Sequence, residues 1–303
     1  DRKAALNAMA DRVEAEVDSM AELLVHEQGK SLANAQFEVH GTAMWLRASA
    51  ATDLPTEVLS DSETQRIELR RRPLGVVGAI TPWNFPNAMI TRKAAPALAA
   101  GCAFVARPSE LTPLSALALG VLAERAGLPA GILQIVPSND ASASGKEFCE
   151  NPKVRKITFT GSTRVGRILL AQAAEQVKKC SMELGGNAPF IVFNDADLDE
   201  AVIGAMACKF RNNGQTCVCA NRIYVQSGVY GDFTARFIKA VEAMQVGDGF
   251  EGADLGPLIS KPALAKVQEH IADALAKGAV VASASAICSC TFASAGFDIN
   301  GPK

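Results

Sequence analysis

The sequence predicts an α/β protein built on a doubly wound parallel sheet, and two observations carry that prediction. Residues 75–80, Gly-Val-Val-Gly-Ala-Ile, are uniformly apolar, which is typical of a parallel strand buried on both faces. Beyond this run, short apolar strands alternate with helical segments, an order typical of βαβ units. The expected strand and helix pairs are 102–105 with 114–126, 133–136 with 143–149, and 154–160 with 164–178.

Two segments precede this sheet. Residues 1–52 carry apolar side chains at helical spacing and predict a helical lead-in. Residues 57–72 alternate polar and apolar side chains and predict an exposed β-ribbon.

A second α/β unit is expected after the glycine pair Gly185-Gly186, so we expect domains at 1–184 and 185–281. Residues 282–303 are rich in Ala and Ser without a clear period, which predicts an unstructured tail. The elements expected in the second unit are strands at 189–193 and 223–225 and helices at 198–210, 230–244 and 261–277.

The composition is that of a globular chain large enough for two domains. Its 303 residues are 49% hydrophobic and 20% charged, which suffices for a sizeable core. A net charge of −2 and an isoelectric point near 6.0 show no excess of positive charge that would favour binding to nucleic acid or an anionic membrane. The apolar runs are interrupted by proline and glycine, so we expect no membrane span.

The eight cysteines are scattered, and their spacing fits neither a disulfide framework nor a zinc site. We therefore expect no metal and a reducing compartment. The expected location is cytoplasmic, with a mitochondrial one as the alternative, because the chain starts at Asp1 without a methionine.

The thiol of Cys217 is the first candidate for chemistry. It follows Gly214-Gln-Thr, where small and polar neighbours let backbone amides approach. A nucleophilic cysteine needs amide dipoles or a base to favour its thiolate. No histidine lies near it in the sequence, so a Cys–His protease is unsupported, and a cysteine without catalytic role is the alternative.

Three further stretches offer matching chemistry. Asn84 follows the strand that ends at Ile80, where its amide can donate to an oxyanion or merely cap a turn. Glu183, beside two glycines, can activate a water or be an ordinary surface carboxylate. The small residues after Phe159 open a helix, and a helix N-terminus suits a phosphate.

Five motifs follow one another along the chain in a fixed order. They are Pro82-Trp-Asn-Phe-Pro, Arg107-Pro-Ser-Glu, Phe159-Thr-Gly-Ser, Glu183-Leu-Gly-Gly and Gly214-Gln-Thr-Cys. This series closely resembles that of the aldehyde dehydrogenase superfamily over about residues 5–281. Within the superfamily, residues 89–93, 181–193 and 209–222 are most similar to the succinate-semialdehyde dehydrogenases.

The resemblance implies an α/β fold with an NAD(P)-binding domain at 1–184 and a partial catalytic domain at 185–281. It also implies the oxidation of an aldehyde to a carboxylic acid. Cys217 would form a thiohemiacetal whose oxyanion is held by the Asn84 side chain and the Cys217 backbone amide. After hydride transfer to the nicotinamide, a water activated by Glu183 would cleave the thioester.

The resemblance further implies a cofactor site on the first domain. Its residues would be Thr81, Pro82, Trp83, Arg107, Ser109, Glu110, Gly145, Phe159, Thr160, Gly161, Ser162, Val165, Leu184 and Gly185. Position 107 departs from the family, which usually has lysine there. Glu110 would repel a 2′-phosphate and Arg107 would tolerate one, so we expect NAD, with NADP as the alternative.

Succinate semialdehyde, oxidised to succinate, is the implied substrate. Arg92 and Arg211 match arginines that hold its distal carboxylate, a role that suits the guanidinium fork. Structural ion pairs are the alternative for both. Cys219 is a candidate redox partner that would form a reversible disulfide with Cys217.

The resemblance stops near Val281. Family members continue beyond this point with a Glu-x-Phe-Gly-Pro motif that binds the nicotinamide ribose. The sequence therefore predicts a C-terminally truncated chain. An inactive nucleotide-binding remnant is the alternative to an active dehydrogenase. The ribbon at 57–72 resembles the segment that bridges subunits in the family, so the parent enzyme is expected to be a homodimer or homotetramer.

Overall fold

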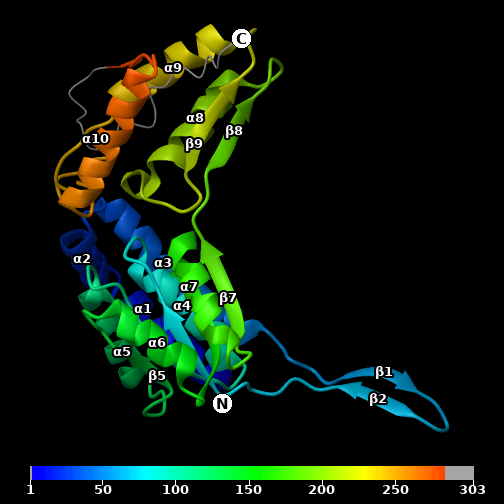
Figure 1. The fold of residues 1–303 in the computed structure, drawn as a ribbon. Helices are drawn as coiled ribbons and strands as arrows, with labels where there is room; N and C mark the ends of the chain where they lie inside the picture. Colours follow the sequence, from blue (N-terminus) through cyan, green and yellow to red (C-terminus); the bar gives the residue numbers. More distant parts are fainter. Residues whose placement is uncertain (1, 284–303) are drawn as a thin grey trace. The chain divides into compact units, whose positions relative to one another are not determined.

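The computed structural model describes residues 2–283, which form two compact units (Figure 1). Of the described residues, 2–23 and 36–184 form the first unit, and 24–35 and 185–283 form the second. The chain passes from the first unit to the second between Leu184 and Gly185, and residues 24–35 belong to the second unit. The reason is local bonding, since Leu32 N donates to Gly249 O at 3.1 Å. Of the expected tail, residues 284–303 lie outside the described residues.

The first unit is built on a parallel sheet of order β5-β4-β3-β6-β7, which confirms the predicted α/β class. Its strands are β3 (Val76–Ile80), β4 (Ala103–Arg107), β5 (Leu133–Ile135), β6 (Val154–Gly161) and β7 (Lys179–Leu184). The strand order reverses between β3 and β6. In open α/β sheets, ligands bind at the carboxyl ends of the strands beside such a switch point.

Helices cover both faces of this sheet (Figure 1). On one face lie α1 (Arg2–Ala15), α4 (Pro86–Ala99) and α5 (Pro113–Arg125), and on the other α6 (Ala141–Glu150) and α7 (Thr163–Ala174). Ile157 and Phe159 of β6 point into the apolar core under α6 and α7. Because side chains alternate along a strand, Lys156, Thr158 and Thr160 lie on the α4 face.

The helical lead-in is completed by α2 (Val17–Gln28) and α3 (Leu32–Ala51). The boundaries between the two units fall inside these two helices. None of the helices in residues 2–283 is long and apolar enough to cross a membrane.

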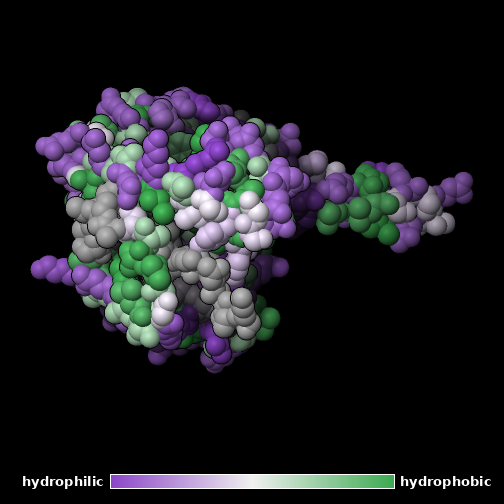
Figure 2. Space-filling view, turned by 90° about the horizontal axis from the view of Figure 1, so that it is seen from above, coloured by the Kyte–Doolittle hydropathy of each residue, from purple (hydrophilic) through white to green (hydrophobic). Residues whose placement is uncertain are grey.

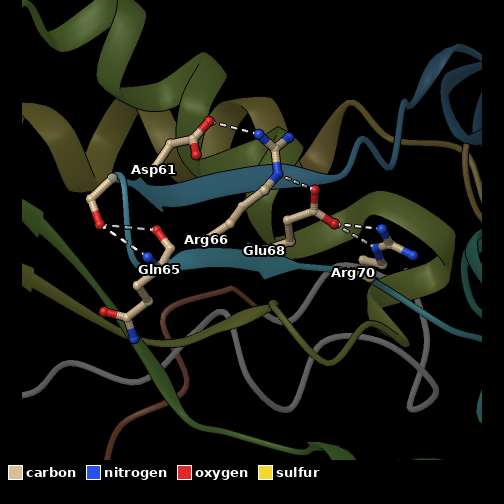
Figure 3. Close-up of polar contacts among 6 residues, drawn as sticks. Asp61, Gln65, Arg66, Glu68 and Arg70 are labelled. Atoms are coloured by element: carbon tan, nitrogen blue, oxygen red, sulfur yellow. Dashed lines mark hydrogen bonds and ion pairs between the residues drawn. The ribbon is translucent and has the colours of Figure 1, made fainter.

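The predicted ribbon is an antiparallel hairpin of β1 (Glu57–Asp61) and β2 (Arg66–Leu69), with a bulge between Val58 and Ser60. Figure 3 shows its charged face, where Arg66 donates to Asp61 at 2.6 Å and to Glu68 at 2.9 Å. Arg70 donates to Glu68 as well, and the two arginines hold the pKa of Glu68 below its ordinary value.

The alternate residues of this hairpin, Ile67 and Leu69, lie on the opposite face and are exposed. Val58 and Leu59 of β1 are exposed too. Figure 2 accordingly shows hydrophobic atoms along the hairpin, which extends to the right in that view.

The second unit has a parallel strand pair, β8 (Ala188–Val192) and β9 (Ala220–Val225). Its helices are α8 (Leu198–Phe210), the short 3₁₀ turn η1 (Arg211–Gly214), α9 (Tyr230–Glu242) and α10 (Lys261–Ala276). The core between the strands, α8 and α9 consists of Val192, Val202, Ala205, Phe210, Phe233, Phe237, Val241 and Leu255. Residues 211–219, called the Cys217 loop below, connect α8 to β9.

Candidate active site

The switch point of the first sheet gathers three motifs that are distant in the sequence. Ile80, the last residue of β3, pairs in register with Arg107 of β4 and with Phe159 of β6. Residues 81–83, 107–109 and 159–162 therefore leave the sheet at the same edge. These stretches include most of the residues predicted to bind a cofactor.

This edge has features that fit a dinucleotide. Thr81 Oγ1, Arg107 Nε and Thr160 Oγ1 are buried and have no hydrogen-bond partner within residues 2–283. At Gly161 a Cβ would meet the ring of Phe159 at 2.4 Å, so only glycine fits there. α7 begins directly after, with Ser162 as its N-cap, and its positive end suits a pyrophosphate.

The remaining residues predicted to bind the cofactor lie in different environments, and some of them have a structural role. Gly145 is buried in α6, where a Cβ would meet Leu169 of α7 at 3.2 Å, so this glycine serves helix packing. Leu184 and Gly185 are exposed at the end of β7, and Val165 donates its N–H to the Ser162 hydroxyl at 3.3 Å. Ser109 is buried and accepts a hydrogen bond from Leu111 N at 3.2 Å.

Arg107 is buried and already paired. Its Nη2 donates to Glu110 Oε2 and to Ser138 O, both at 2.7 Å. A backbone hydrogen bond and the Arg107 guanidinium lower the pKa of Glu110, so Glu110 is ionised at neutral pH. The charges of this pair offset each other, which weakens the repulsion that Glu110 alone would exert on a 2′-phosphate.

A cavity of about 400 Å³ lies on the α4 face of the sheet and is lined in part by Arg92, Lys93 and Glu183. It brings the predicted water-activating carboxylate and a predicted substrate arginine into one pocket. Lys93 Nζ donates to Thr158 Oγ1 at 3.2 Å. Burial lowers the pKa of Lys93 to about 8, helped by the Arg92 charge and opposed by Glu183. Lys93 was not singled out as a site residue in the sequence.

Asn84 lies half-buried in the loop between β3 and α4. The first turn of α4 lacks a side-chain cap of its own. Instead the buried Glu38 carboxylate of α3 accepts hydrogen bonds from Asn87 N at 2.9 Å and Ala88 N at 3.1 Å. An anion at a helix N-terminus is favourable, and here it fixes the end of the loop that carries Asn84.

The Cys217 loop of the second unit starts with an unusual backbone. Asn212, Asn213 and Gly214 have φ values of 56°, 59° and 71°. Asparagine and glycine tolerate this left-handed region best, which explains the Asn-Asn-Gly sequence.

Buried amides lock this loop in place. Asn213 Nδ2 donates to Gly29 O at 3.0 Å and to Pro257 O at 3.1 Å, while its Oδ1 accepts from Gly256 N at 2.9 Å. Gln215 Oε1 accepts from Ile259 N at 3.1 Å. Sequence reasoning missed both residues, although paired asparagines before a glycine were a usable signal.

Cys217 is exposed, whereas the other described cysteines are buried or partly buried. Arg211 is exposed at the start of η1. Cys219 is buried, and its Sγ donates to Lys209 O at 3.2 Å, a bond that a disulfide with Cys217 would have to break. That disulfide stays a prediction. Within residues 2–283, no three His, Cys, Asp or Glu side chains gather as they would around a metal ion.

Comparison with known proteins settles the family. The model of the aldehyde dehydrogenase family matches residues 1–291, nearly the whole chain.

The chain belongs to the aldehyde dehydrogenase family.

Among curated members of the aldehyde dehydrogenase family, the succinate-semialdehyde dehydrogenase [NADP(+)] of Escherichia coli is 54% identical over 268 residues, which are 87% of this chain and 55% of that protein. The 3-sulfolactaldehyde dehydrogenase of Pseudomonas putida is 55% identical over 267 residues, 86% of this chain and 54% of that protein. The chain thus spans about half the length of the curated relatives it matches.

A solved family structure, the succinate-semialdehyde dehydrogenase from Burkholderia pseudomallei, is 51% identical with a TM-score of 0.92. The match covers 98% of this chain and 61% of that one. The predicted family and fold are therefore confirmed.

Proposed function

We propose that this chain carries the cofactor site and the nucleophile of an NADP-dependent aldehyde dehydrogenase that oxidises succinate semialdehyde to succinate. The observation that carries the proposal is the cavity shared by Arg92 and Glu183, which combines an anion-binding guanidinium with a carboxylate able to activate water. The two curated relatives support it, because the substrate in each of their names bears an anionic group beside its aldehyde, a carboxylate or a sulfonate.

The chain's own residues would perform the acyl chemistry. Cys217 Sγ attacks the aldehyde carbon, and the Asn84 amide and the Cys217 backbone N–H donate to the resulting oxyanion. NADP, when bound, supplies the hydride acceptor. Glu183 then takes a proton from a water that attacks the thioester carbonyl, which releases the acid and frees the thiol.

The residues at the switch point would bind the cofactor. The α7 N-terminus would bind the pyrophosphate, and the buried hydroxyls of Thr81 and Thr160 would serve as hydrogen-bond partners. We propose NADP rather than NAD, because the Arg107 charge offsets the negative charge of Glu110 and because the E. coli relative is named for NADP.

An inactive nucleotide-binding remnant of such an enzyme is the second candidate. One experiment distinguishes the active dehydrogenase from the inactive remnant. The purified 303-residue chain is given succinate semialdehyde and NADP, and NADPH formation is followed by absorbance. We expect turnover that falls at least about a thousandfold in Cys217→Ala, because loss of a covalent nucleophile removes the reaction path.

Cys208→Ala, a change at a partly buried cysteine of α8, is the matched control and should keep the wild-type rate within about twofold. No NADPH formation by the wild-type chain would favour the remnant. NADPH formation that persists in Cys217→Ala would refute the assigned nucleophile.

A further inference from the structure

The Arg92 guanidinium lies over an aromatic ring. Its Cζ is 5.5 Å from the centroid of the Trp45 ring, within the range of a cation–π contact. Arg92 lies on α4, and Trp45 lies on the part of α3 that belongs to the first unit, as α4 does. Trp45 is 36% exposed, so the ring is neither fully buried nor free in solvent.

This contact leaves the arginine's hydrogen-bonding capacity intact. A guanidinium stacked on a ring uses its face, so its in-plane N–H groups stay available for a carboxylate. Within residues 2–283, Arg92 makes no ion pair with an acidic side chain, and its Nη1 makes only a weak contact of 3.9 Å with Met89 Sδ. For Arg92, a structural ion pair, the alternative raised by the sequence, is therefore absent from the described residues.

The surroundings make such a support necessary. Arg72, Lys93 and Lys156 line the same cavity, and among the described residues Glu183 is the one acidic side chain in its lining, so cations outnumber carboxylates around Arg92 and repel its guanidinium. Without a favourable contact, a flexible arginine would swing away from this positive group into solvent. The quadrupole of the indole offers that contact at a defined place beside the cavity.

We infer that Trp45 is a positioning residue that holds the Arg92 guanidinium for the distal anion of the substrate and so sets the preference for anionic over neutral aldehydes. This inference rests on the proposed function, since it assumes that Arg92 binds the substrate.

Trp45→Leu removes the π face while keeping an apolar side chain. We expect its KM for succinate semialdehyde to rise about tenfold, between the scales of an exposed and a desolvated cation–π contact, with kcat changed less than about twofold. The KM for butanal, a neutral aldehyde of the same carbon number, should stay within about twofold. Trp45→Phe, which keeps a weaker π face, should recover most of the loss.

Binding of succinate to the same variants, followed by NMR titration, measures the effect without turnover and should show the same order of dissociation constants. Phe37→Leu is the matched control, because Phe37 is an exposed aromatic residue of α3 and should leave both readouts unchanged. A merely structural role of Trp45 would weaken both aldehydes equally, and that outcome would overturn the inference.

Arg92→Met separates this inference from the proposed function. If Arg92→Met leaves succinate semialdehyde and succinate binding unchanged, the assigned substrate role of Arg92 is wrong. If Arg92→Met weakens both and Trp45→Leu does not, only the positioning role is wrong. In the double variant, Trp45→Leu should add little to Arg92→Met, because both changes remove one interaction.

Discussion

At the scale of single residues, burial sorts groups of the same chemical type into different roles. Cys217 is exposed while Cys219, two positions on, points inward to the Lys209 carbonyl. Arg107 is buried and paired, whereas Arg92 rests on an indole with its donors available. Lys93 is partly buried beside Arg92, so its charged form is disfavoured.

Lys93 leads to a prediction on stability and pH. Its pKa is about 8 in the folded protein and takes the ordinary value of 10.5 when unfolded. Between these values the unfolded chain binds more protons, so this group makes the free energy of unfolding rise with pH. In Lys93→Met we expect that rise to be smaller across the same window.

The check is urea denaturation followed by circular dichroism at several pH values from about 7 to 11. Lys153→Met, at an exposed lysine, serves as the control and should follow the wild-type curve. Parallel curves for wild type and Lys93→Met would show that burial does not perturb Lys93.

At the scale of elements, the end of one helix is held by another. α4 begins without a side-chain cap from its own flank, and α3 supplies the Glu38 carboxylate in its place. The loop with Asn84 is thereby fixed at both ends, by β3 before it and by this cap behind it. In the second unit the buried amide of Asn213 does the same for the loop with Cys217.

Glu38→Gln should lower the free energy of unfolding by about 1–3 kcal/mol, because it removes the negative charge that strengthens two buried hydrogen bonds at the α4 N-terminus. Urea denaturation measures this change. Glu124→Gln, at an exposed position of α5, is the matched control and should stay within about 0.5 kcal/mol. Equal effects of the two substitutions would argue against a capping role for Glu38.

At the scale of the whole molecule, the β1–β2 hairpin presents an apolar face to solvent. Ile67 and Leu69 are 40% and 41% exposed, and exposed apolar ribbons with free edges tend to pair with other chains. We propose, as the sequence predicted, that this hairpin takes part in self-association of the protein.

Leu69→Asp should therefore weaken self-association at least about tenfold, since a charge would be buried at the contact. Analytical ultracentrifugation over a range of concentrations measures it. Thr64→Asp, which adds the same charge beyond the strands, should leave association unchanged. A chain that is monomeric at all concentrations, or a Leu69→Asp variant that associates as before, would count against the proposal.

Most elements of the fold were predictable because their patterns are local. The buried strand at 75–80 and the hairpin at 57–72 appear where the periodicity places them, as Val76–Ile80 and as β1 with β2. β7 was missed as a strand. It has no continuous apolar run that would mark it as a buried strand. Its residues alternate polar with apolar side chains, because only the face with Cys180 and Met182 is covered by the core.

The sequence by itself determined the fold class, the family and the identity of Cys217, Asn84 and Glu183 as candidates, because motifs and hydrophobic periodicity are properties of short stretches. Tertiary structure alone decided that Arg92 and Glu183 share a cavity, that Trp45 contacts Arg92 and that Asn213 holds the Cys217 loop in place. These contacts join residues that are far apart in the chain. They depend on strand register and helix packing, which no local pattern encodes.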